Sequence, residues 1–355
     1  MEISLPATLR AWFADRRRDL PWRVTDERGL RDPYRTWISE IMLQQTRVEA
    51  VIPFFDNFML QFDGPESLAA AEEEQVLKAW AGLGYYRRAR MLHAASASLV
   101  GEYGGAFPQS STELKSLPGV GAYTSAAIAS LAFGERIPVV DGNVKRVVAR
   151  YLALELAADD PKLERAAREQ GDVWMMELPD GDLPAAGQLN EALMELGATV
   201  CLPRNPLCES CPVAASCAAL EVGRAKDLPL PKKVKKWVDL EMVFLVQRVG
   251  VRVLLKARSE GWSPGLYEPP STTFSNQPAE LAAATLLQEL AASRRQTATA
   301  PESCGVVRHT ITNHRIRAHI FTAAAKRSDL NEHWIDPESV PLTGLARKVL
   351  TSALL

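Results

Sequence analysis

Four of the chain's five cysteines lie close together in the segment CLPRNPLCESCPVAASC. A disulfide framework of this density is typical of secreted proteins, whereas cytosolic cysteines stay reduced and bind metals or do chemistry. Zinc ribbons usually carry two C-x2-C pairs, and this segment has one, so zinc is the less favoured ligand. Four thiolates in one short loop suit a [4Fe–4S] cluster, in which each iron binds one cysteine. The predicted cluster ligands are Cys201, Cys208, Cys211 and Cys217.

Two carboxylates stand in sequence contexts that suit acid–base chemistry. Glu40 lies in TWISEIMLQQT among apolar residues, where burial raises the pKa of a carboxyl group and keeps it protonated near neutral pH. Asp141 follows an apolar run in VVDGNVKRV, where a helix begins, so it is expected to be an N-cap. A cap also fixes a side chain rigidly. From the residues alone, Glu40 can equally be a solvated helix residue and Asp141 only a helix cap, so both are candidates for acid–base chemistry.

A glycine-rich turn precedes the helical segment AYTSAAIASLAF. In LPGVG, Gly119 and Gly121 allow a tight turn, and the following helix presents free backbone amides at its first turn. Such a helix end binds phosphate through those amides and the helix dipole, without basic side chains. The segment is therefore a candidate DNA-binding hairpin, although a helix–turn–helix packing unit would show the same pattern.

The elements that must position these residues divide at a linker. Residues 1–223 have helical periodicity, including 36–55, 74–100 and 122–133, and are expected to be one helical domain. The lysine- and proline-rich residues 224–236 are expected to form an extended linker. Residues 237–355 alternate with a period of two around two helical segments, which predicts a small α+β domain.

Charge is distributed unevenly between these parts. Residues 1–225 contain 23 Lys and Arg against 31 Asp and Glu, and the remaining residues contain 18 against 12. This charge does not favour a nucleic-acid partner, and if the acidic first part binds DNA it must do so through a local patch and backbone amides. The N-terminal segment contains charges throughout and does not read as a signal peptide, and no apolar run is long enough for a bilayer, so a cytoplasmic location is expected.

The cysteine spacing behind a helical domain resembles the helix–hairpin–helix DNA glycosylases that carry an iron–sulfur cluster, the endonuclease III and MutY group. The stretch SEIMLQQT is similar to the signature of the MutY-type adenine glycosylases. This resemblance implies that Glu40 protonates the adenine, that Asp141 stabilises the cationic sugar, and that Asn143 and Tyr123 position groups around them. It also implies that the substrate is duplex DNA with adenine opposite 8-oxoguanine or G, bound by a monomer.

The hairpin residue Tyr123 separates two branches of this group. In the endonuclease III branch a lysine at this position forms a Schiff base and cleaves the strand, which a tyrosine cannot do. A monofunctional glycosylase is therefore favoured over a pyrimidine-lesion glycosylase/lyase, and Lys145 is expected to contact phosphate. A non-catalytic iron–sulfur DNA-binding protein is the remaining alternative, which the pair of carboxylates opposes.

The resemblance also implies residues that contact the DNA bases. Gln45 and Thr46 of LQQT, with Leu83 and Tyr85 of GLGYY, are expected to contact bases where the flipped nucleotide was.

The second domain resembles the MutT-like (Nudix-fold) domain of MutY enzymes, most clearly at GWSPGLYEPP, but lacks the glutamate-rich hydrolase helix. In HTITN, Thr312 and Asn313 occupy positions that read the lesion in the family, and Ile311 replaces an aromatic residue. Cys304 is expected to be an ordinary core residue.

Overall fold

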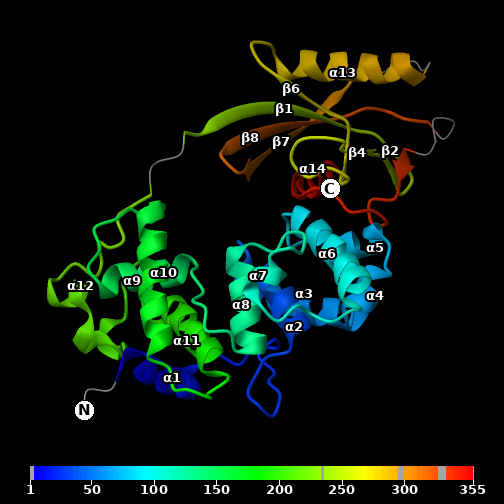
Figure 1. The fold of residues 1–355 in the computed structure, drawn as a ribbon. Helices are drawn as coiled ribbons and strands as arrows, with labels where there is room; N and C mark the ends of the chain where they lie inside the picture. Colours follow the sequence, from blue (N-terminus) through cyan, green and yellow to red (C-terminus); the bar gives the residue numbers. More distant parts are fainter. Residues whose placement is uncertain (1–3, 233–235, 295–299, 327–332, 355) are drawn as a thin grey trace. The chain divides into compact units, whose positions relative to one another are not determined.

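The structure is a computed structural model that describes residues 4–232, 236–294, 300–326 and 333–354. The chain divides into two compact units, the first comprising Met1–Ala71 and Arg90–Val234 and the second Glu72–Ala89 and Lys235–Leu355 (Figure 1). The first unit is helical and the second combines a sheet with helices, which confirms the predicted fold class. None of the helices within the described ranges is long and apolar enough to cross a membrane.

The following α-helices lie wholly within the first unit. They are α1 (Leu5–Arg16), α2 (Pro33–Leu43), α3 (Val48–Gln61), α4 (Pro65–Ala69), α7 (Ser111–Leu114), α8 (Ala122–Phe133), α9 (Gly142–Tyr151), α10 (Pro161–Met176), α11 (Ala185–Thr199) and α12 (Ala218–Glu221). Helix α5 (Glu73–Ala79) lies in the second unit, where α6 (Arg87–Tyr103) also begins.

Helix α11 organises the part of the first unit that carries the predicted chemistry. It packs against α1, α8 and α9, and α8 in turn packs against α2. Its apolar face, including Leu189, Leu193 and Leu196, forms one buried core with Val144 and Val148 of α9. The starts of α8 and α9 and the end of α2 are thereby held around one point.

Two stretches with helical periodicity are each broken by a turn. Residues 36–55 form α2 and α3, separated at Gln45, whose φ is 60°. Residues 74–100 form α5 and α6, separated by a turn in which Gly82, Gly84 and Tyr85 have positive φ. Left-handed backbone cannot continue an α-helix, so periodicity alone overestimates the length of both helices.

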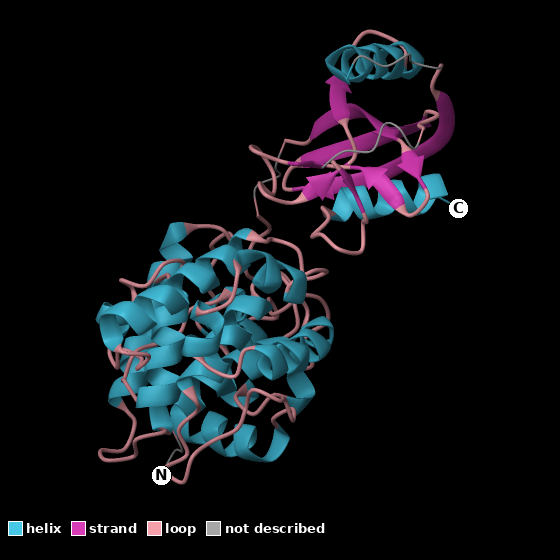
Figure 2. Cartoon of the chain, turned by 90° about the vertical axis from the view of Figure 1, so that its right-hand side faces the viewer, coloured by secondary structure: helices cyan, strands magenta, loops and turns pink. Residues whose placement is uncertain are grey.

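The second unit contains a four-stranded sheet in the order β6-β1-β8-β7, in which β1 runs parallel to β8 and antiparallel to β6. One face packs against α13 and the other against α14, as Figure 2 shows. Two small sheets, β2-β3-β9 and β4-β5, complete the unit. The bounds are β1 Val238–Val246, β2 Arg248–Val249, β3 Arg252–Leu254, β4 Lys256–Ala257, β5 Tyr267–Glu268, β6 Ser271–Phe274, α13 Ala279–Arg294, β7 Glu302–Ile311, β8 His314–Thr322, β9 Trp334–Ile335 and α14 Gly344–Leu354.

Two local expectations about the second half of the chain are wrong. Cys304 is exposed, because it lies at a bulge in the edge strand β7 and its thiol contacts the Thr322 hydroxyl at 3.2 Å. The start of the expected linker is packed, because Ala225 and Leu228 are buried against Ala219 near the cysteine loop. Residues 233–235 of that linker lie outside the described residues.

Candidate active site

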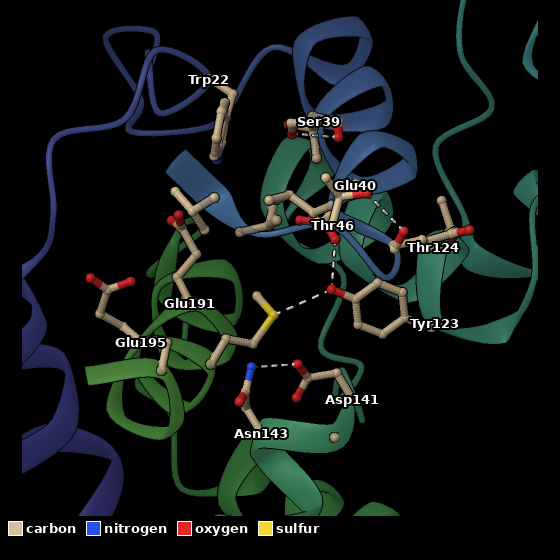
Figure 3. Close-up of a pocket in the computed structure, with 18 of the residues that line it drawn as sticks. Trp22, Ser39, Glu40, Thr46, Tyr123, Thr124, Asp141, Asn143, Glu191 and Glu195 are labelled. Atoms are coloured by element: carbon tan, nitrogen blue, oxygen red, sulfur yellow. Dashed lines mark hydrogen bonds between the residues drawn. The ribbon is translucent and has the colours of Figure 1, made fainter. Parts of the chain in front are cut away.

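A cavity of about 780 Å³ opens in the first unit between α2, α8, α9 and α11. It brings together residues that are far apart in the sequence, and Figure 3 shows Glu40, Tyr123, Asp141 and Asn143 converging on it. The predicted residues that line it are Glu40, Gln45, Thr46, Gly119, Gly121, Tyr123, Asp141, Asn143 and Lys145.

Glu40 lies near the end of α2 and is only 7% exposed. Burial raises the pKa of its carboxyl group from 4.5 to about 7, opposed by a hydrogen bond from Tyr123, while the charges of Asp141 and Glu191 raise it further. The Tyr123 hydroxyl donates to Oε2 at 2.6 Å, which leaves Oε1 to carry a proton (Figure 3). Glu40 is thus arranged to act as a general acid near neutral pH.

Asp141 is the N-cap of α9, as its position in the sequence predicts. Oδ1 accepts from the backbone amide of Val144 at 2.7 Å, and Oδ2 accepts from the Asn143 amide group at 2.9 Å. Burial raises the pKa of Asp141, and these hydrogen bonds lower it. A carboxylate held by two donors in a buried cavity suits the stabilisation of a developing positive charge.

Tyr123 stands in the first turn of α8, where its hydroxyl also lies 3.5 Å from the sulfur of Met194. Burial raises the pKa of this phenol well above its ordinary value, so it remains a hydrogen-bond donor. The amino group of Lys145 lies 3.7 Å from Glu164 at the edge of the cavity.

A buried ionic network forms one wall of the cavity and was not predicted. Arg18 and Arg23 donate to Glu195, while Arg23 and Arg31 donate to Glu191. Burial would raise the pKa of Glu195, but the hydrogen bonds and charge of its two arginines lower it to about 2. These groups place charged hydrogen-bonding atoms where a base could bind. The available sequence signal was a pair of glutamates four residues apart among the mostly apolar residues of α11.

The predicted hairpin has the backbone that its glycines suggested. Gly119 has φ of +75°, and a Cβ there would lie 2.5 Å from the Cβ of Met91, so both the conformation and the space require glycine. Gly121 is the N-cap of α8 and, as a glycine, makes no side-chain hydrogen bond to the free amides. The start of α8 is therefore available to bind an anion.

The predicted base contacts have different environments. Gln45, with φ of 60°, and Thr46 lie at the cavity. Leu83 and Tyr85 lie in the second unit: Leu83 is 7% exposed and therefore does not protrude, whereas Tyr85 is 52% exposed.

The predicted lesion-contacting residues lie at the turn between β7 and β8. Thr312 is exposed with φ of 54°, and Asn313 donates to the backbone carbonyl of Lys236 at 3.3 Å. Ile311 packs against the core beneath α14, which is the ordinary reason for an apolar residue at this position.

The four predicted cluster ligands form one loop of reduced, partly buried cysteines. Burial raises the pKa of the Cys211 thiol to about 11, and the charges of Cys201, Cys208 and Cys217 act in the same direction. No three acidic, histidine or cysteine side chains in the described part of the chain are spaced to hold a single metal ion. A four-iron cluster binds one thiolate per iron, so four cysteines in one loop are the donor set that such a cluster requires.

Two arginines of α9 attach this loop to the cavity. Arg150 donates to the Cys201 sulfur at 3.3 Å and to the Leu202 carbonyl at 2.7 Å. Arg146 donates to the Cys201 carbonyl and to the side-chain oxygen of Asn143, both at 2.8 Å. The position of the cysteine loop is thereby coupled to the residue that holds Asp141.

The fold and this site define a helix–hairpin–helix protein with an iron–sulfur loop, and comparisons with known proteins agree. Residues 38–171 match the HhH-GPD superfamily of base excision DNA repair proteins, and residues 201–217 match the iron–sulfur binding domain of endonuclease III. The structure of a thermostable thymine-DNA glycosylase is 30% identical with a TM-score of 0.52, over 61% of this chain and 95% of that one.

The particular family follows from sequence relatives. An adenine DNA glycosylase of Mycolicibacterium smegmatis is 41% identical over 60% of this chain and 69% of its own length. The human adenine DNA glycosylase is 38% identical over 79% of this chain, and the match spans about half (51%) of the human protein. The chain belongs to the adenine DNA glycosylase family, whose cofactor is a [4Fe–4S] cluster.

Proposed function

We propose that this protein removes adenine paired with 8-oxoguanine, or with G, from duplex DNA. The observation that carries the proposal is the buried Glu40 carboxyl, with its raised pKa, beside the hydrogen-bonded carboxylate of Asp141 in one cavity. Family membership and the match to adenine DNA glycosylases support the choice of base.

The chemistry follows from these two groups. Adenine is a poor leaving group until a ring nitrogen is protonated, and Glu40 supplies that proton once the nucleotide is flipped into the cavity. The bond between C1′ and the base then breaks, and adenine leaves with the bonding electrons. Asp141 stabilises the positive sugar by charge, as one carboxylate does in glycoside hydrolysis. Water adds to C1′, and its proton returns to Glu40.

Other residues would bind and orient the DNA. The amides at Gly121 and the start of α8 would hold a phosphate, and Lys145 would contact another. Arg23 and Glu191, charged groups on the cavity wall, would hydrogen-bond the polar edge of the flipped base. The cluster, held by the four cysteines, would shape the loop beside α9 without taking part in the chemistry.

The remaining proposals concern organisation. We propose a catalytic domain at 1–223 and a Nudix-like lesion-recognition domain at 237–355, joined by residues 224–236, whose first residues pack beside the cysteine loop, with Thr312 and Asn313 contacting the opposite base. The protein would act as a cytoplasmic monomer.

Single-turnover base release tests this function. Matched duplexes carry A opposite 8-oxoguanine, G, C or T, and alkali reveals the abasic sites. Fast release opposite 8-oxoguanine, slower release opposite G and none opposite T is expected. Absence of adenine release by cluster-loaded protein would refute the proposal and direct the search to pyrimidine lesions. Strand cleavage without alkali would contradict the role of Tyr123, which cannot form a Schiff base.

A further inference from the structure

The turn between α5 and α6 holds an aromatic side chain in an unusual conformation. Gly82 and Gly84 have φ of 118° and 71°, as glycines can, but Tyr85 also has positive φ at 49°. A non-glycine residue in this region is strained, and bulky residues rarely adopt it. Tyr85 is nevertheless 52% exposed, so burial of its ring does not account for the conformation.

Arg88 makes the contacts that hold this turn. Its guanidinium lies 5.3 Å from the ring centroid of the buried Trp80 and 5.7 Å from that of Tyr85, so both rings stack on one cation. It also donates to the backbone carbonyls of Leu83 and Gly84 at 3.4 and 3.3 Å. The Trp80 ring nitrogen donates to the same Gly84 carbonyl at 3.1 Å. The guanidinium therefore joins the ring and the backbone of the strained segment.

The position of Arg88 in helix α6 also indicates that this residue serves the turn. It lies in the first turn of α6, where the helix dipole disfavours a positive charge. Burial lowers the pKa of the guanidinium to about 10, partly offset by Tyr85, so the cation is present at neutral pH in spite of that cost. The contacts with the turn, rather than helix formation, explain an arginine here.

We propose that Arg88 is a positioning residue for DNA recognition, which holds the exposed Tyr85 ring so that it stacks on a nucleobase of the substrate duplex. The inference rests on the proposed function and adds a residue that does not itself touch the DNA. Arginine is required because its planar group stacks on two rings and donates to two carbonyls at once, which an ammonium group cannot do. An aromatic side chain stacked on a base contributes roughly a 10-fold or larger factor to binding.

A double-mutant cycle tests this role. Adenine release at subsaturating protein, and the Kd for the same duplex, are measured for wild type, Arg88→Met, Tyr85→Ala and the double variant. If Arg88 acts through Tyr85, each single substitution lowers the rate of adenine release and raises the Kd, both about 10-fold. The double variant then shows no greater loss than the more impaired of the two single variants. Losses that multiply in the double variant would overturn the proposal.

Two further variants separate positioning from charge and folding. Arg88→Lys keeps the charge and is expected to fail like Arg88→Met, whereas recovery of wild-type Kd by lysine would overturn the proposal. Arg87→Met removes a neighbouring exposed charge from the same helical turn and is expected to have little effect. Thermal melts identify any variant that is unfolded, and Arg88→Lys then carries the test.

The outcome for the wild type distinguishes the two proposals. If it binds the duplex but releases no adenine, the proposed function fails, and the cycle on Kd still reports whether Arg88 acts through Tyr85. If it releases adenine normally while the cycle is additive, only the role of Arg88 fails. A 2-aminopurine placed next to the mispair gives an independent signal, because loss of stacking should change its fluorescence alike in Arg88→Met and Tyr85→Ala; a change in Tyr85→Ala alone would count against Arg88.

Discussion

Replacing Glu40 by glutamine measures how much the raised pKa of the Glu40 carboxyl changes the free energy of unfolding with pH. The pKa of this carboxyl rises from 4.5 to about 7 on folding, mainly through burial. The folded protein therefore binds this proton more tightly than the unfolded chain does. Stability contributed by the proton is present below pH 4.5 and is lost as the pH rises through 7. The rise corresponds to ~3 kcal/mol.

Glutamine does not titrate, so Glu40→Gln should lack this loss. The free energy of unfolding of the variant minus that of wild type should therefore increase by ~3 kcal/mol from pH 4.5 to pH 8. Any effect of the substitution on packing adds the same amount at every pH. At roughly 2–4 °C per kcal/mol for a unit of this size, the difference in Tm should change by about 6–12 °C over that range. Thermal melts of cluster-loaded wild type and variant at a series of pH values measure it.

Glu195→Gln is the matched control, because it also removes a buried carboxylate from the cavity wall. The pKa of Glu195 is about 2, so its stabilisation is present above its ordinary pKa and lost only as the pH falls toward 2. This variant should be destabilised by a constant amount between pH 5 and 8. If the difference between Glu40→Gln and wild type is equally constant, Glu40 is ionised at neutral pH and the assignment of a general acid is refuted.

Three other outcomes are expected. Adenine release should fall about tenfold per pH unit above pH ~7 as Glu40 loses its proton, and a flat single-turnover profile to pH 9 would contradict this. Gly197→Ala should destabilise the protein by about 1–3 kcal/mol and slow release, because the new Cβ would lie 2.5 Å from the Cβ of Asn143; an unchanged Tm would show that α9 and α11 can separate freely. Arg146→Met removes hydrogen bonds to Asn143 and to the carbonyls of Gly197 and Cys201, so release should slow by about tenfold while visible absorbance reports retention of the cluster. Wild-type release by this variant would mean that the cysteine loop and the cavity are independent.

Local chemistry explains why much of the site could be predicted from the sequence. Cluster ligands within one loop, glycines in one tight turn and an N-cap aspartate each act over a few residues, so their types and spacing are visible in the chain. The helical and alternating periodicities likewise identify α13 and α14 and the two structural classes, because one face of each element must be buried.

Only tertiary structure decided the remaining features, because they depend on residues that are distant in sequence. The network around Glu191 and Glu195 joins arginines about 160–177 positions away, and no local pattern reports such a pairing. The same holds for the parallel pairing of β1 with β8 and for the exposure of Cys304. The raised pKa of Glu40 belongs to both levels. Its apolar neighbours suggested the burial that mainly raises it, whereas only the cavity supplies the Tyr123 hydroxyl that lowers it and the nearby carboxylates that raise it further.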